Sequence, residues 1–221
     1  MKTKIILTGA TGMVGEGVLL GCFAHPDVEK VLVIGRRTCG VTHPKLEEVL
    51  YNDFMDLSPI AEKFKGYCSC FFCAGVSSVG KKEDEYYKLT YDMTTHFAKT
   101  FIEQNPVVKL SFCYVSGSGT DSTEKGKTMW ARVKGKTENT LIKMFPEGAY
   151  MFRPGYMKPV KGQKNVKRFY FGWQVFYPIM KFLMPKFTCT LEEVGRAMIN
   201  CAAKGYSKNI LEVKDIIDCS K

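Results

Sequence analysis

Long hydrophobic runs are absent from this chain of 221 residues. No uninterrupted apolar stretch approaches the length that a helix needs to cross a bilayer, which argues against a transmembrane segment. The opening residues, MKTKIILTGATG, show neither a long apolar segment nor a cleavage-site pattern, so secretion is not expected. Internal repeats and low-complexity linkers are missing too. We therefore expect a single domain over residues 1–221.

Metal-binding patterns are also scarce. The three histidines, at positions 25, 43 and 96, have no metal-ligand spacing. Cys70 and Cys73 form a C-x-x-C pair, but zinc would need a second pair, and a redox C-x-x-C usually opens a helix. The nine cysteines are odd in number and irregularly spaced. Buried free thiols in a reducing cytoplasm are therefore favoured over disulfides, and we expect no metal and a cytoplasmic location.

Acidic residues are the minority among the charged ones. Lysine and arginine number 32 against 22 aspartates and glutamates, which gives a formal net charge of +10. Such a charge suits an anionic partner, whether a phosphorylated cofactor, an acidic lipid surface or a nucleic acid. Charge alone does not choose among the three.

What the sequence does contain is a regular alternation of apolar runs and helical patterns. The runs are continuously apolar, as expected for strands of a parallel sheet that is covered by helices on both faces. This pattern predicts a Rossmann-type, doubly wound α/β fold with a small C-terminal substrate-binding lobe at 156–187. The expected strands are 4–8, 31–35, 48–51, 68–75, 109–116, 149–153 and 209–213, and the expected helices are 12–23, 83–104, 128–144 and 190–205.

Three glycines lie between the first expected strand and the first expected helix. Gly9, Gly12 and Gly15 have the spacing G-x-x-G-x-x-G. A tight turn there needs positive φ, and a phosphate approaching the backbone leaves no room for a Cβ. Free N–H groups at the helix N-terminus would then bind the phosphates. The position of the triplet predicts a dinucleotide site that also includes Thr11, Met13 and Val14.

The second expected strand ends without an acidic residue. An NAD site usually has a carboxylate there for the ribose 2′-hydroxyl, whereas this sequence reads VIGRR. The guanidinium groups of Arg36 and Arg37 match a 2′-phosphate through charge-assisted hydrogen bonds. NADP(H) is therefore favoured over NAD(H), with two solvated surface arginines as the alternative.

With these motifs the chain resembles the short-chain dehydrogenase/reductase superfamily, in its extended or atypical, epimerase-like branch. The resemblance covers nearly the whole chain, and small Tat-interacting-protein-like members are the most similar. It rests on the glycine triplet, YNDFMDL, FFCAGV (71–76), YVSGSG (114–119), WARVKGKTE (130–138), FRPGYM (152–157) and the helix TLEEVGRAMINCA. It implies cofactor contacts at Asp53, Phe54, Cys73, Ala74, Gly75, Lys134, Arg153 and Pro154.

The resemblance also implies catalytic roles. Lys134 would bind the nicotinamide ribose, and a serine at the end of the expected strand 109–116 would hydrogen-bond the substrate carbonyl. Ser116 and Ser118 both fit, and Ser118 is favoured. The departure is Trp130, which stands where the family has the tyrosine of Tyr-x-x-x-Lys. An indole donates a hydrogen bond but accepts none and does not ionise, so it cannot shuttle a proton.

Three outcomes follow from Trp130. The proton donor is another group, with Tyr156 first, then Ser118, then a water held by Lys134; or the reaction needs less acid help; or catalysis is lost. The sequence thus predicts an NADP(H)-binding oxidoreductase or epimerase-like protein acting on a small, partly apolar carbonyl or alcohol. The alternative is a non-catalytic NADP(H)-binding redox-sensing regulator.

The segment 156–187 combines lysines and an arginine with a dense run of aromatic residues, including Trp173. A pocket wall or a homodimer face is the favoured interpretation. Peripheral contact with an anionic membrane is the next alternative, because basic and aromatic side chains suit a charged interface. Nucleic acid is not expected.

Overall fold

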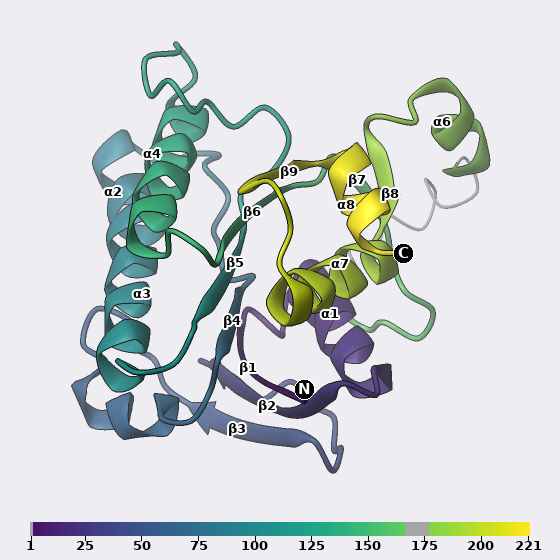
Figure 1. Cartoon of the computed structure of the whole chain (residues 1–221). Helices are drawn as coiled ribbons and strands as arrows, with labels where there is room; N and C mark the ends of the chain where they lie inside the picture. The colour runs from purple at the N-terminus through teal and green to yellow at the C-terminus, as the bar shows by residue number, and fades with distance from the viewer. Residues whose placement is uncertain (1, 167–176) are drawn as a thin grey trace.

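A computed structural model describes residues 2–166 and 177–221 of the chain. A seven-stranded sheet lies between two layers of helices (Figure 1). Every hydrogen-bonded pair of neighbouring strands in this sheet is parallel. The strand order is β3 (Leu46–Leu50), β2 (Val28–Gly35), β1 (Thr3–Thr8), β4 (Ser69–Phe72), β5 (Ser111–Val115), β6 (Ala149–Arg153) and β9 (Ile210–Glu212). The predicted doubly wound parallel sheet is confirmed.

Each face of the sheet is buried under its own set of helices. Along β1, Ile5 and Leu7 belong to one apolar cluster and Ile6 to the other, because successive side chains point to opposite faces. Both faces therefore need apolar residues, which explains the continuous apolar runs. One face carries α1 (Met13–Ala24), α7 (Leu191–Lys204) and α8 (Val213–Cys219), and the other carries η1 (Ser58–Phe64), α3 (Met93–Gln104) and α4 (Met129–Met144) (Figure 1).

Several elements differ from those expected. The expected helix 83–104 is divided into α2 (Glu83–Tyr87), a π-helical turn η2 (Lys88–Asp92) and α3. The strand expected at 68–75 ends at Phe72, because the chain leaves the sheet there and enters a loop. Helices η1 and α8 were not expected. The expected helix 190–205 is α7, and a capping box begins it, with the Thr190 hydroxyl accepting a hydrogen bond from the Glu193 N–H at 3.0 Å.

The C-terminal segment 156–187 contains two elements that the sequence did not indicate. β7 (Tyr156–Lys158) pairs with β8 (Thr188–Thr190) in a separate two-stranded sheet, and α6 (Tyr177–Leu183) precedes β8. Phe182 is 85% exposed and Leu183 is 69% exposed on α6. The homodimer face and the membrane contact stay predictions, and Lys167, Arg168 and Trp173 lie outside the described residues. In the described ranges, no helix combines the length and apolarity that bilayer crossing requires.

Candidate functional site

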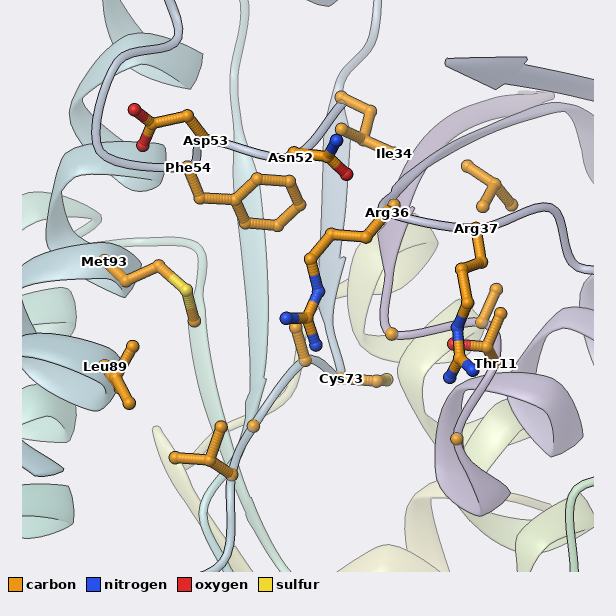
Figure 2. A pocket seen from close by; sticks show the side chains of 18 of the residues that line it. Thr11, Ile34, Arg36, Arg37, Asn52, Asp53, Phe54, Cys73, Leu89 and Met93 are labelled. Atoms are coloured by element: carbon orange, nitrogen blue, oxygen red, sulfur yellow. The ribbon is translucent and has the colours of Figure 1, made fainter. Parts of the chain in front are cut away.

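A pocket of about 450 Å³ opens at the carboxyl end of the sheet, where β1 and β4 lie side by side (Figure 2). Strands β2 and β3 extend from β1 in one direction, and β5, β6 and β9 extend from β4 in the other. In open α/β sheets, ligands bind at such a reversal of strand order. The pocket is lined by the loops after β1, β2, β3 and β4 and by residues of η2 and α3.

The turn from β1 into α1 is packed so closely that Gly9 and Gly15 leave no room for a Cβ. Gly9 has φ +75°, and a Cβ there would stand 2.6 Å from the Cys73 carbonyl group. A Cβ on Gly15 would overlap the carbonyl oxygen of Gly9. The first glycine thus permits the turn and the contact with the β4 loop, while Gly15 lets α1 start directly against the turn. The positive φ at Gly9 is the one that the sequence predicted for a tight turn, whereas the close approach of a phosphate stays a prediction.

Gly12 is the N-cap of α1 and has no side chain to cap it. Among the residues that the structure describes, no side chain accepts a hydrogen bond from the N–H groups that follow it. The N-terminus of a helix carries partial positive charge and directs these N–H groups at any anion in front of it. Gly9, Thr11 and Gly12 line the pocket at this point. Met13 and Val14, by contrast, pack against the apolar cluster behind the turn.

The two predicted arginines stand at the end of β2, on the rim of the same pocket. Arg36 and Arg37 are exposed, and both line it. Figure 2 shows the Arg36 side chain extending into the hollow, with the Phe54 ring facing it. Asp53 lies in the lining as predicted, but its carboxylate accepts a hydrogen bond from the Met55 N–H at 2.8 Å. The carboxylate therefore stabilises its own loop.

The loop after β4 closes the pocket from the other side. Cys73, Ala74 and Gly75 line it as predicted. The Ala74 N–H donates a hydrogen bond to the Thr8 hydroxyl at 3.2 Å, which ties the end of β1 to the β4 loop. The remaining wall was not predicted: Asn52, Met55 and Val76 lie in the motifs YNDFMDL and FFCAGV but were not expected to touch the cofactor, and the residues at 88–93 belong to no motif. That wall comprises Asn52, Met55, Val76, Lys88, Leu89 and Met93, together with residues of the glycine loop and β2. Three of the six lie on η2 or at the start of α3, and π-helical turns often accompany functional sites.

Lys134 lies on α4 as predicted and is directed toward the end of β5. Its Nζ donates a hydrogen bond to the Ser116 carbonyl oxygen. Of the two predicted serines, Ser116 is buried and its hydroxyl is directed at the Glu138 carboxylate, whereas Ser118 is partly exposed. Ser118 is therefore better placed to meet a substrate. Its catalytic role, like that of Lys134, stays a prediction.

Trp130 lies one turn before Lys134 on α4. Its ring packs over Gly119 in the loop after β5, where a Cβ would stand 3.5 Å from the indole Cη2. Gly119 has φ +84°, a backbone conformation that residues with a side chain rarely adopt. The indole therefore lies next to the serine-bearing loop. The described packing accounts for Trp130 as an aromatic that fills this space.

Arg153 has a structural partner that the sequence did not reveal. The Glu138 side chain is fully buried and accepts hydrogen bonds from both Nε and Nη2 of Arg153. Arg153 also contacts Ser122 and, at 3.3 Å, the Glu212 carboxylate. The pocket lining does not include Arg153. A glutamate on the buried face of α4, four residues after Lys134, was the available signal for this ion pair.

Tyr156 and Pro154 lie on the segment that follows β6. The Pro154 carbonyl oxygen accepts a hydrogen bond from the Ser118 N–H at 2.9 Å, so this segment positions the serine loop. Tyr156 is on β7, and its ring centroid lies 6.3 Å from that of Tyr177 on α6. Neither residue lines the described pocket. In the described part of the chain, no three His, Cys, Asp or Glu side chains form a metal-binding group.

Burial changes the protonation of Lys134. Loss of solvent lowers the pKa of its amine to about 8, although the nearby Glu138 carboxylate acts in the opposite direction. We therefore expect the Lys134 amine to lose its charge as the pH rises through about 8, which an NMR titration of lysine side-chain resonances measures. Lys136, two residues further along α4, is the matched control. Its pKa is raised by hydrogen bonding to Tyr87, so it stays charged throughout that range. Simultaneous titration of the two lysines would contradict this assignment.

Comparison with curated proteins gives remote relatives. No protein-family model matches the chain. A relative called Protein fmp52, mitochondrial, from Emericella nidulans is 24% identical over 218 residues, which cover 94% of this chain and 90% of the relative. Two relatives from Aspergillus species also have mitochondrial in their names. The expected cytoplasmic location is therefore wrong. Missing secretion signals argue only against export and do not distinguish the cytoplasm from the mitochondrion.

Solved structures share the fold over almost the whole chain. UDP-glucose 4-epimerase from Thermotoga maritima has a TM-score of 0.65 at 15% identity, and the match covers 98% of this chain and 81% of the epimerase chain. The Bordetella bronchiseptica enzyme WbmF, solved with NAD⁺, has a TM-score of 0.64 at 15% identity and covers 99% of this chain and 76% of its own. The chain therefore has the Rossmann-type fold of these enzymes, and of a short chain dehydrogenase family protein from Francisella tularensis, as the resemblance seen in the sequence implied.

Proposed function

We propose that this chain binds NADP(H) in the pocket between β1 and β4 and acts as an oxidoreductase or epimerase-like enzyme. Cofactor binding rests on a single observation. Behind the tightly packed Gly9 turn, no side chain of the described residues caps the N-terminus of α1. The pyrophosphate would meet the free N–H groups of α1, and the adenosine would lie toward Phe54. WbmF, which has the same fold, was solved with NAD⁺, and this supports a nicotinamide cofactor.

The preference for NADP(H) over NAD(H) rests on the end of β2. Arg36 and Arg37 line the pocket rim, and the residue before them is Gly35. No carboxylate stands on the chain at this point to bind a ribose 2′-hydroxyl or to repel a 2′-phosphate. A guanidinium can bind two oxygens of the 2′-phosphate of NADP(H) at once. NAD(H) has only a hydroxyl at this position and cannot form this pair of hydrogen bonds.

The Arg36→Ala variant tests this preference. We expect it to weaken NADPH binding by about tenfold or more, equal to about 1.4 kcal/mol, while NADH binding changes little. Arg196→Ala is the matched control, since Arg196 is an exposed arginine on α7 outside the pocket. Calorimetric titration of each variant with both cofactors gives the comparison. An Arg36→Ala protein that binds NADPH as the wild type does would refute the 2′-phosphate argument.

The proposed oxidoreductase or epimerase-like activity rests on Lys134 and the nearby Ser118. When bound, the nicotinamide supplies or accepts a hydride. Lys134 would hold the nicotinamide ribose from α4, and the partly exposed Ser118 would donate a hydrogen bond to a substrate carbonyl. Val76, Leu89 and Met93 give one wall of the pocket an apolar character, which supports a partly apolar carbonyl or alcohol as substrate.

The second candidate function is a non-catalytic NADP(H)-binding regulator. Trp130 favours it, because an indole packed over Gly119 replaces the phenol that would otherwise deliver the proton. Incubating the protein with NADPH and a panel of carbonyl compounds separates the two functions. An enzyme consumes NADPH with some member of the panel, and its Lys134→Ala variant does not. A regulator binds NADPH, turns over nothing, and changes its affinity for a protein partner with the redox state of the cofactor.

A further inference from the structure

Two thiols meet between the helices that cover one face of the sheet. Cys201 lies on α7 and Cys219 is the last residue of α8, and their sulfur atoms are 3.3 Å apart. All nine cysteines of the chain lie within the described residues. In that part of the molecule, no other pair of cysteine sulfurs is in hydrogen-bond contact. The pair is remote from the pocket in the sequence and contributes nothing to its lining.

The surrounding contacts hold the two sulfur atoms together. The side-chain amide of Asn200 donates a hydrogen bond to the Cys219 carbonyl oxygen at 2.8 Å, which fixes the end of α8 against α7. The Cys219 thiol donates to the Ala197 carbonyl oxygen at 3.6 Å, one helical turn before Cys201. The Cys219 sulfur thus rests on the surface of α7 beside Cys201. Closing the gap to a bond length of about 2.05 Å requires a movement on the order of 1 Å, which rotation of the two side chains provides.

The two thiols differ in accessibility and in acidity. Cys201 is buried, whereas Cys219 is partly exposed. A hydrogen bond from Cys201 lowers the pKa of the Cys219 thiol, and the positive charge of Lys204 acts in the same direction. The pKa of Cys201 is raised by the same pairing and by burial. We therefore expect the Cys219 thiolate to react with an oxidant first and the Cys201 thiol to react afterwards with the oxidised Cys219.

We propose that Cys201 and Cys219 form a redox modification site, at which a hydroperoxide converts the two thiols into an intramolecular disulfide. The Cys219 thiolate attacks the peroxide oxygen, forms a sulfenic acid and, after protonation, releases water or an alcohol. The Cys201 sulfur then attacks the Cys219 sulfur, and the sulfenic hydroxyl leaves with the Cys201 proton as water. Two electrons pass from the thiols to the peroxide. A dithiol reductant reverses the reaction.

The disulfide would join α7 to α8, the helices that come before and after β9 in the chain. Glu212, which pairs with Arg153 at the end of β6, lies between the two cysteines in the sequence. The bridge closes a loop across a sequence separation of 18 residues and so restricts the unfolded chain. We therefore expect the oxidised protein to unfold at a higher temperature than the reduced protein, and the difference to vanish after reduction.

Peptide mapping of the full chain tests the proposal. The protein is treated with hydrogen peroxide, its remaining thiols are blocked with an alkylating reagent, and it is digested without reductant. We expect a cross-linked peptide containing Cys201 and Cys219, lighter than the sum of its two parts by two hydrogen atoms, which separates after reduction. Recovery of both cysteines in alkylated form, or of Cys219 as an unbridged sulfinic acid, would overturn the proposal.

Two variants serve as controls. Cys219→Ser removes the more exposed thiol, and we expect it to abolish both the cross-linked peptide and the rise in unfolding temperature. Cys39→Ser removes another partly exposed thiol, one that lies beside Glu48 rather than beside a second cysteine. It should leave both results as in the wild type. A cross-linked peptide that persists in Cys219→Ser, with Cys201 joined to another cysteine, would also overturn the assignment.

Discussion

Replacing Glu138 by alanine is expected to lower the free energy of unfolding by about 3–5 kcal/mol, because it leaves a buried guanidinium without its buried counter-charge. The Glu138 side chain is fully buried, and the Arg153 side chain is 10% exposed. The same carboxylate accepts a hydrogen bond from the Ser116 hydroxyl, so the variant also removes one of the two acceptors of this buried donor, the other being the Phe152 carbonyl oxygen. Urea denaturation followed by circular dichroism measures the change.

The matched control is Glu212→Ala. Glu212 pairs with the same arginine at 3.3 Å, but its side chain is 52% exposed. An exposed ion pair contributes about 1 kcal/mol or less, so this variant should retain nearly all of the wild-type stability. The double variant Glu138→Leu with Arg153→Met should be more stable than Glu138→Ala, since apolar residues often replace a buried ion pair without loss. Equal effects of Glu138→Ala and Glu212→Ala would contradict the importance assigned to burial.

The Gly9→Ala variant is expected to weaken NADP(H) binding by about 100-fold or more, equal to about 2.7 kcal/mol at 25 °C. Gly9 has φ +75°, and the added Cβ would stand 2.6 Å from the Cys73 carbonyl group and 2.7 Å from the Ala74 nitrogen. The methyl group must therefore displace either the turn or the β4 loop, and both line the pocket. Backbone strain at positive φ adds about 1–3 kcal/mol.

Gly21→Ala is the control on the helix that follows the same turn. Gly21 lies on α1, and a Cβ there would meet nothing nearer than the Gly195 Cα at 3.9 Å. Alanine is a better helix former than glycine, so this variant should bind NADP(H) normally and be slightly more stable. Fluorescence titration with NADPH compares the variants, and circular dichroism establishes that each is folded. A folded Gly9→Ala protein with unchanged affinity would show that the cofactor does not use this turn.

The sheet could be predicted from sequence because its signals are local. Continuous apolar runs and a glycine triplet at residues 9–15 identify strand, turn and helix without knowledge of distant contacts. β7 and β8 gave no such signal. Each is three residues long, and their pairing joins Tyr156 to Thr188 across a long stretch of chain. Nothing local in the sequence specifies such a contact.

The residues of the candidate site also fall into those that a local motif predicted and those that only the folded structure reveals. Residues predicted at the end of β1, the end of β2 and the end of β4 meet in one pocket, because parallel strands bring their carboxyl ends to one edge. Met13 and Val14 do not line it. Arg153 matched a family motif but is engaged with Glu138, because the charge lies inside the fold and needs a buried partner. Lys88 reaches the pocket from a segment without a motif, and Asn52 lies beside the predicted Asp53 but was not itself indicated. Only the tertiary arrangement identifies them.

Calorimetric titration of the purified wild-type chain with NADPH tests the central claim most directly. A nicotinamide dinucleotide seated between the α1 N-terminus and the end of β2 predicts saturable binding of one cofactor per chain. It also predicts weaker binding of NADH, which lacks the 2′-phosphate that Arg36 and Arg37 would recognise. Absence of binding by all four of NADPH, NADP⁺, NADH and NAD⁺ to a folded protein would contradict the account.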